Sequence, residues 1–158
     1  MMTLACKVIH ALGDRTAATA ESCTGGMIGA VLTAVPGASR VFKGGIISYS
    51  NEIKNCLLGV ETELLDRCGP VSAPVAEAMA RGARAVLRTD MAVSVTGLAG
   101  PGGDDYGNPV GTVFIGYADE NDTRTEKYRF AGEREAVRQQ AVRAALDLLL
   151  RMCRENEN

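Results

Sequence analysis

The chain has 158 residues, of which 46% are hydrophobic, enough apolar material for one core of ordinary domain size. Its 17 basic and 19 acidic residues give a net charge of −2, and the basic ones are spread along the chain. We therefore expect neither nucleic acid nor a membrane surface as a partner. There is no apolar stretch of about 20 residues and no secretory signal pattern, so we expect a single cytosolic domain over residues 1–158.

Cysteine and histidine usage narrows the chemistry further. Five cysteines, an odd number with no C-x-x-C pair, predict neither a disulfide framework nor a zinc site. The single histidine, His10, falls off the apolar stripe that Leu4, Val8 and Leu12 make on a predicted helix, so we interpret it as a surface residue. We accordingly expect no metal, no cofactor and no mechanism built on imidazole.

Apolar spacing and turn residues predict alternating helices and strands. In chain order these are a helix at 3–13, a strand at 16–20, a helix at 27–35, a strand at 43–49, helices at 51–58 and 73–87, strands at 91–96, 110–118 and 123–130, and a helix at 133–151. The last two strands read as a hairpin, whereas the earlier ones alternate with helices. This order predicts an α/β fold, a three-layer α/β/α sandwich with a mixed, mostly parallel sheet of about five or six strands.

The first candidate site is the segment ESCTGG at residues 21–26, where a strand ends and a helix begins. Ligands in open α/β sheets gather at such junctions, and free amides at a helix start can stabilise an oxyanion or a phosphate. Ser22 suits a nucleophile on a strand-turn-helix elbow. The alternative is that Ser22 or Thr24 caps the following helix.

A second candidate lies at the next junction, SYSNEIK at residues 48–54. Ser50 or Asn51 can cap the helix, which places Lys54 about one turn in, near the same sheet edge. A lysine whose pKa is lowered by burial can act as a base for a serine, and Tyr49 can hold or relay a proton. The alternative is a surface lysine beside a half-buried tyrosine.

Two further segments suggest ligand contacts. The glycine-rich loop 97–109 follows a buried strand, and such a loop either cradles a phosphate with its amides or merely connects two strands. It matches neither the P-loop nor the dinucleotide fingerprint. At the start of the last helix, Arg134 and Arg138 can clamp a phosphate, or form a solvated helix face.

An ordered set of motifs carries a family resemblance. The segments AESCTGG, PGASRVFKGGIISYSNEIKNCLLGV, GPVS, SVTGLAGPGG and NPVGTVFIGYA, in this order and at these intervals, resemble the CinA carboxy-terminal domain family. Members of this type are known as nicotinamide-nucleotide amidohydrolases, which convert nicotinamide mononucleotide to nicotinate mononucleotide and ammonia. The resemblance covers nearly the whole chain and implies an α/β/α layered domain with a mixed sheet.

The resemblance also implies roles for particular residues. Ser22 would be the nucleophile, with Lys54 and Tyr49 as its activating partners. Backbone amides would hold the oxyanion, namely those of Cys23, Thr24, Gly25 and Gly26. Contacts to a nucleotide substrate are expected from Glu21, Asn51, Thr96, Gly97, Ala99, Gly100, Gly102, Gly103, Arg134 and Arg138. A homo-oligomer is compatible with the sequence.

The chain departs from the family pattern at Asn108, where members commonly carry a lysine before Pro-Val-Gly-Thr. If that lysine assists phosphate binding, Arg134 has to supply the charge or affinity is lower. Three alternatives stay open: Cys23 as the nucleophile, a nucleotide-binding module without catalysis, and a competence- or damage-associated interaction module. A cysteine without histidine lacks its usual activator, which favours Ser22.

Overall fold

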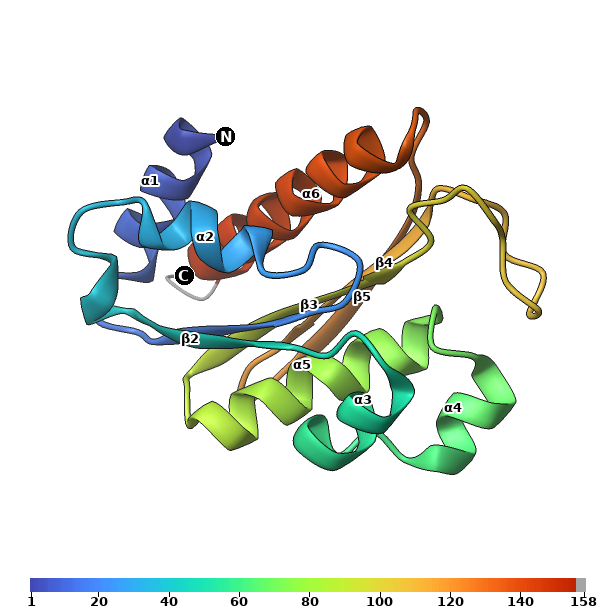
Figure 1. Cartoon of the computed structure of the whole chain (residues 1–158). Helices are drawn as coiled ribbons and strands as arrows, with labels where there is room; N and C mark the ends of the chain where they lie inside the picture. The colour runs from blue at the N-terminus through green and yellow to red at the C-terminus, as the bar shows by residue number, and fades with distance from the viewer. Residues whose placement is uncertain (156–158) are drawn as a thin grey trace.

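The computed structural model describes residues 1–155. A five-stranded mixed sheet runs through its centre (Figure 1). The strands are β1 (Ala17–Glu21), β2 (Phe42–Ile47), β3 (Met91–Gly97), β4 (Thr112–Ala118) and β5 (Thr123–Arg129), in the spatial order β2-β1-β3-β4-β5. β1 pairs in parallel with β2 and β3, whereas β4 is antiparallel to β3 and β5. The predicted mixed sheet is confirmed, with five strands.

Helices cover both faces of the sheet. One layer holds α1 (Met2–Leu12), α2 (Met27–Thr33) and α6 (Arg134–Glu155); the other holds α3 (Asn51–Leu58), α4 (Thr62–Cys68) and α5 (Ala73–Leu87), with a 3-10 turn at Ala38–Arg40 before β2 (Figure 1). This arrangement confirms the predicted three-layer sandwich. Within residues 1–155 no helix combines the length and apolar character needed to cross a membrane.

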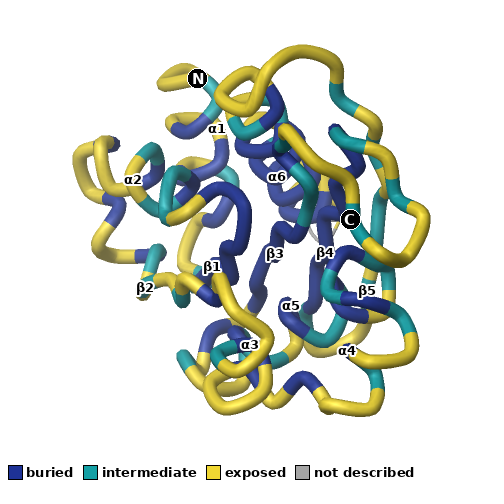
Figure 2. Tube along the Cα trace, turned by 45° about the vertical axis from the view of Figure 1, so that its right-hand side comes forward, coloured by how far each residue is buried: buried dark blue, intermediate teal, exposed yellow. Residues whose placement is uncertain are grey.

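The central strands are buried on both faces because helices lie above and below them (Figure 2). β1 is made of small residues and alternates between the layers: Ala17 joins the core beneath α1, α2 and α6, whereas Ala18 and Ala20 join the core with α5. Glu21 takes the α2 side. Small side chains in β1 therefore let two helical layers approach one sheet, and the alternation predicts that Ser22 turns toward the α3 side.

The helices α3 and α5 approach each other to backbone contact. Gly82 in α5 lies against the end of α3, and a Cβ placed on it would overlap the carbonyl oxygen of Leu58. Leu58 is itself buried against Val75, Met79 and other residues of the core on the α5 side of the sheet. The absence of a side chain at position 82 therefore sets the distance between these two helices.

Candidate active site

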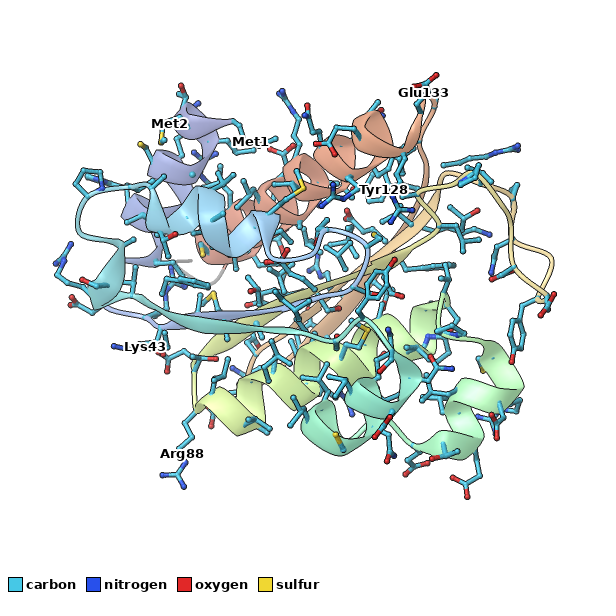
Figure 3. The ribbon with its side chains drawn as sticks, viewed as in Figure 1. Met1, Met2, Lys43, Arg88, Tyr128 and Glu133 are labelled. Carbon is cyan, nitrogen blue, oxygen red and sulfur yellow. The ribbon has the colours of Figure 1, made fainter. Side chains whose placement is uncertain are left out.

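A pocket of about 370 Å³ opens at the sheet edge where β1, β2 and β3 end. Its volume lies in the range typical of small-molecule sites. The carboxyl ends of parallel strands meet at one edge, which brings together segments far apart in sequence. Glu133, directly before α6, lies at the same end of the molecule as the loop between β3 and β4 (Figure 3). The pocket is lined by Ser22, Cys23, Tyr49, Asn51, Lys54, Pro70, Val71, Thr96, Gly97, Leu98, Ala99, Gly100, Gly102 and Arg134.

Ser22 is the first residue after β1. Its amide donates to the carbonyl oxygen of Val95 at 3.0 Å, which prolongs the pairing with β3 by one residue. Its carbonyl oxygen accepts from the amide of Gly25 at 3.1 Å, which closes a tight turn. Gly25 and Gly26 both have positive φ values, of 58° and 97°, and glycine adopts these without steric cost. The turn presents the Ser22 side chain to the pocket, as an elbow does for a nucleophile.

Lys54 meets Ser22 from the first turn of α3. Ser50 caps this helix by accepting from the amide of Ile53 at 3.2 Å, as one of the two predicted caps. The Lys54 amine is 3.2 Å from the Ser22 hydroxyl and donates to the carbonyl oxygen of Ser48 at 2.7 Å. Only 1% of the lysine is exposed, and burial lowers its pKa to about 8, with Cys23 opposing the shift. Among residues 1–155 no carboxylate pairs with it.

The thiol of Cys23 stands one residue from Ser22 but in a different environment. Cys23 is 6% exposed and belongs to the core cluster shared with α1, α2 and α6. Burial raises its pKa to about 11, although its own amide, Arg138 and Lys54 act in the opposite direction. A protonated thiol is a poor nucleophile at neutral pH, so this environment favours the hydroxyl of Ser22 as the attacking group.

The predicted oxyanion amides divide into two pairs. Gly25 donates to Ser22, and Gly26 donates to a carboxylate oxygen of Glu21 at 3.0 Å, so these two are occupied. The amides of Cys23 and Thr24 reach no acceptor in another residue of the described part of the chain. Both residues are buried, and the Cys23 amide is hydrogen-bonded only to its own thiol. Buried amides that lack a partner in another residue are rare in folded proteins. The amide after a nucleophile is the usual oxyanion donor of such elbows, which makes the Cys23 amide the stronger of the two candidates.

Glu21 has a different place from the one expected of a substrate contact. It is 1% exposed, and its carboxylate accepts from the amides of Gly26, Ile28 and Gly29 at 2.9 to 3.1 Å. It also accepts from the hydroxyl of Thr24 at 2.7 Å. These bonds satisfy donors at the start of α2 that would otherwise lack partners. Glu21 therefore builds the Ser22 turn from behind and does not line the pocket.

Tyr49 and Arg134 lie at the rim. Tyr49 is 66% exposed, and its hydroxyl accepts from Arg134 at 3.4 Å. Arg134 also donates to the carbonyl oxygen of Gly100 at 2.8 Å, so it ties the start of α6 to the glycine loop. Neither Ser22 nor Lys54 is a hydrogen-bond partner of Tyr49 within residues 1–155. This geometry gives Lys54 direct access to Ser22 without a tyrosine relay and gives the rim a positive charge.

The glycine loop forms the opposite wall. Gly97, Ala99, Gly100 and Gly102 line the pocket as predicted, but Gly103 does not. Thr96 also lines it, although its hydroxyl is engaged with the carbonyl oxygen of Pro70 at 2.7 Å.

Three apolar wall residues had no predicted role: Pro70, Val71 and Leu98. Pro70 and Val71 belong to the GPVS segment, and its place in the family pattern was the only feature of the sequence that could have indicated a role in the pocket. Together with Leu98 and Ala99 they give the pocket an apolar wall.

Arg138 lies outside the pocket, in contrast to its predicted role as a phosphate clamp. Its guanidinium donates to the carbonyl oxygens of Cys23 and Thr24 and forms an ion pair with Glu135. His10 is exposed on α1, as predicted, and does not line the pocket. No three His, Cys, Asp or Glu side chains of the described chain come together as a metal site.

Asn108 holds the outer part of the loop rather than facing the pocket. Its side chain donates to the carbonyl oxygen of Val71 at 3.0 Å and to Asp104 at 2.8 Å. Partial burial raises the pKa of Asp104, but hydrogen bonds from Asn108 and Tyr106 outweigh this and lower it. The Tyr106 hydroxyl donates to the carbonyl oxygen of Asp66 at 3.1 Å. Position 108 thus fastens the loop to the segment before α5.

Comparison with known proteins identifies relatives over most of the chain. Residues 2–153 match the model of the CinA C-terminal domain. A CinA-like protein from Geobacter sulfurreducens is 52% identical over 136 residues, covering 86% of this chain and 33% of that protein. Another from Thermosynechococcus vestitus is 51% identical over 154 residues, covering 94% and 37%. The chain therefore spans about a third of the length of the curated relatives it matches.

Solved structures agree with this relationship. Competence damage-inducible protein A from Klebsiella pneumoniae superposes with a TM-score of 0.92 at 36% identity, covering 95% of this chain and 94% of that one. Competence/damage inducible protein CihA from Agrobacterium tumefaciens gives 0.91 at 38% identity, covering 94% and 93%. Sequence and fold together establish that this chain belongs to the CinA C-terminal domain family.

Proposed function

We propose that the protein is a serine amidohydrolase that deamidates nicotinamide mononucleotide to nicotinate mononucleotide and ammonia in the cytosol. One observation carries the proposal: a buried lysine amine, with a pKa lowered to about 8, stands 3.2 Å from the hydroxyl of Ser22. A buried lysine without a carboxylate partner is costly for the fold, and such groups cluster at active sites. The family resemblance supplies the substrate.

The first half of the reaction forms an acyl-enzyme. Neutral Lys54 accepts the hydroxyl proton of Ser22 while the serine oxygen attacks the carboxamide carbon. The resulting oxyanion accepts from the amides of Cys23 and Thr24, which have no acceptor in another described residue. The protonated lysine then gives its proton to the departing nitrogen, and the C–N bond breaks to release ammonia.

The second half hydrolyses the ester. Water, deprotonated by the again neutral Lys54, attacks the acyl carbon, and the serine oxygen leaves with the proton returned from the lysine. The product is a carboxylate, nicotinate mononucleotide. One amine carries every proton in this scheme, so the proposed mechanism needs no histidine.

The pocket walls support an aromatic amide joined to a phosphate. Val71 and Leu98 offer an apolar surface to a ring, and Arg134 offers a guanidinium at the rim, where a phosphate can reach it. The substrate would then lie with its carboxamide at Ser22 and its phosphate outward.

The direct test is incubation of the purified protein with nicotinamide mononucleotide, followed by assay of ammonia and nicotinate mononucleotide, with a chelator present. We expect both products in equal amounts from the wild type and none from Ser22→Ala. Cys23→Ala is the matched control and should retain most of the activity, because its thiol is buried and protonated. Tight binding without ammonia would instead identify a binding module, and loss of activity in Cys23→Ala alone would make the thiol the nucleophile.

A further inference from the structure

The peptide groups that follow Ser22 are held in a regular pattern. The carbonyl oxygen of Ser22 accepts from Gly25, that of Cys23 accepts from Arg138, and that of Thr24 accepts from Met27 and Arg138. In a trans peptide the N–H points away from the carbonyl across a rigid plane. Fixing a carbonyl therefore fixes the direction of the next amide. The amides so fixed include those of Cys23 and Thr24, which donate to no other residue of the described chain.

Arg138 is the only side chain among residues 1–155 that donates to these carbonyls. Its Nε lies 3.0 Å from the Cys23 oxygen and its Nη2 lies 3.4 Å from the Thr24 oxygen. The remaining nitrogen, Nη1, pairs with Glu135 at 2.7 Å one turn earlier on α6. A planar guanidinium joins two neighbouring carbonyls through rigidly spaced nitrogens, which a lysine cannot do.

We infer that Arg138 is a positioning residue that aims and polarises the oxyanion amide of Thr24 by holding the Cys23–Thr24 peptide from the side opposite the pocket. The inference rests on the proposed function of Ser22. A cation on a peptide oxygen draws electron density from the attached N–H, so the donor facing the oxyanion becomes stronger. The arginine thereby acts on the reaction through the main chain and without touching the substrate.

The contacts separate this role from substrate binding. Arg138 does not line the pocket, whereas Arg134, one turn earlier on the same helix, does. All three nitrogens of the Arg138 guanidinium are engaged with protein acceptors. The two arginines of α6 thus divide two tasks, with one facing the substrate and the other facing the loop that carries the nucleophile.

The test measures the reactivity of Ser22 without the natural substrate. A fluorophosphonate probe labels an activated serine, and its phosphoryl oxygen takes the place of the oxyanion. We expect intact-mass analysis to show labelling of the wild type and none of Ser22→Ala. Arg138→Gln should be labelled at least about tenfold more slowly, because a misaligned oxyanion donor loses part of the 10² to 10³ effect of a deleted one.

Matched variants separate positioning from folding. Glu135→Gln removes the ion pair but leaves both loop contacts of Arg138, so its labelling should stay within twofold of the wild type. Arg138→Lys keeps the positive charge but loses the rigidly spaced nitrogens of the guanidinium. Its labelling rate should lie between those of the wild type and Arg138→Gln. Labelling of Arg138→Gln within twofold of the wild type overturns the inference, as does a slowing that merely follows the unfolded fraction at the assay temperature.

Turnover adds a second readout and keeps the two proposals apart. With nicotinamide mononucleotide, Arg138→Gln should lower kcat about tenfold with KM within twofold, whereas a phosphate clamp would raise KM instead. If the wild type is labelled at Ser22 but releases no ammonia, the proposed substrate is wrong, and the labelling rate of Arg138→Gln alone decides the role of Arg138. Failure of the wild type to be labelled at Ser22 overturns both.

Discussion

The two loops that enclose the pocket are built in opposite ways. The loop after β1, residues 22–26, is short and largely buried, and Glu21, Val95 and Arg138 hold it from three sides. The loop between β3 and β4 is longer and largely exposed, and its tip is fastened mainly by Asn108 and Tyr106.

This difference matches the tolerance that each task allows. A nucleophile and its oxyanion donors must be held within a fraction of an ångström, and interlocked main-chain bonds supply that rigidity. A wall that recognises a ligand tolerates small shifts, because contacts can re-form around the bound molecule. The short loop is thus suited to the proposed chemistry, and the long loop is suited to the proposed recognition of the substrate.

Removal of the base should have the largest effect. Lys54→Met should lower the rate of amide hydrolysis by at least about 10³-fold, because Ser22 loses the acceptor for its proton. The same change should raise the free energy of unfolding at pH 7 by about 1–3 kcal/mol, since a buried ammonium is costly. Ammonia assay and urea denaturation of the two proteins measure these effects.

The stability that Lys54→Met gains over the wild type should depend on pH, in a direction set by the pKa of Lys54. The pKa of Lys54 is about 8 in the folded protein, below the ordinary value of 10.5. Burial of the charged lysine therefore lowers the stability of the wild type in full below pH 8, and this loss of stability shrinks as the pH rises toward 10.5. The advantage of Lys54→Met should therefore shrink between pH 8 and 10. The wild-type kcat/KM should rise with pH and level off above about 8. A constant stability gap, or a rate that falls through this range, would contradict a neutral lysine base.

Glu21→Gln is expected to damage the short loop next most severely. An amide places an NH₂ group where a carboxylate oxygen accepts from main-chain donors, so the variant should lose about 2–3 kcal/mol of stability and roughly tenfold in kcat. Thermal unfolding, with a fall of roughly 5–10 °C, and steady-state kinetics measure both. Glu77→Gln, which removes an exposed ion pair with Arg81, is the control and should change stability by less than about 0.5 kcal/mol.

At the rim, Arg134→Gln tests recognition instead of chemistry. KM for nicotinamide mononucleotide should rise about tenfold with kcat nearly unchanged, because a charged hydrogen bond to the phosphate is lost. The same substitution should leave KM for the nucleoside, which has no phosphate, unaltered. Arg143→Gln, on the same helix but 71% exposed in its side chain, serves as the control. An equal penalty for both substrates would exclude a phosphate contact.

The smallest effect is expected from loosening the long loop. Asn108→Ala removes the bonds to Val71 and Asp104, and we expect KM to rise about two- to fivefold with kcat within twofold. Limited proteolysis should cut the loop faster than in the wild type. A loss of kcat as large as that of Glu21→Gln would show that the two loops are not divided as described.

Sequence patterns predicted the elements whose ends carry strong signals. The helices α3 and α5 have the predicted bounds, because Ser50 and Gly59 mark the ends of the first and Pro74 marks the start of the second. β2 ends two residues earlier than predicted, at Ile47, where the chain leaves the sheet toward α3. No element was predicted at Thr62–Cys68, because seven residues are too few for a helical period to stand out.

Strand-to-helix junctions at one sheet edge placed Ser22 and Lys54 near each other, but a surface lysine fitted the pattern as well, and the family resemblance was what implied their pairing. The roles of Glu21 and Arg138 did not follow. A charged residue near a predicted ligand loop looks the same in sequence whether it faces a ligand or satisfies the main chain from behind. Only the hydrogen-bond partners distinguish the two, and these depend on the packing of α2 and α6 against the loop.

The contact between Gly82 and the end of α3 affects the environment of Lys54 from a distance. Lys54 lies on α3, so the depth at which its amine sits is governed by how closely that helix can approach α5. A single methyl group at position 82 would push the helix outward and let water reach the amine, which would bring its basicity back toward that of a lysine in solution. Variation at a position outside the pocket would in this way shift the pH dependence of the proposed reaction without replacing any residue that lines the pocket.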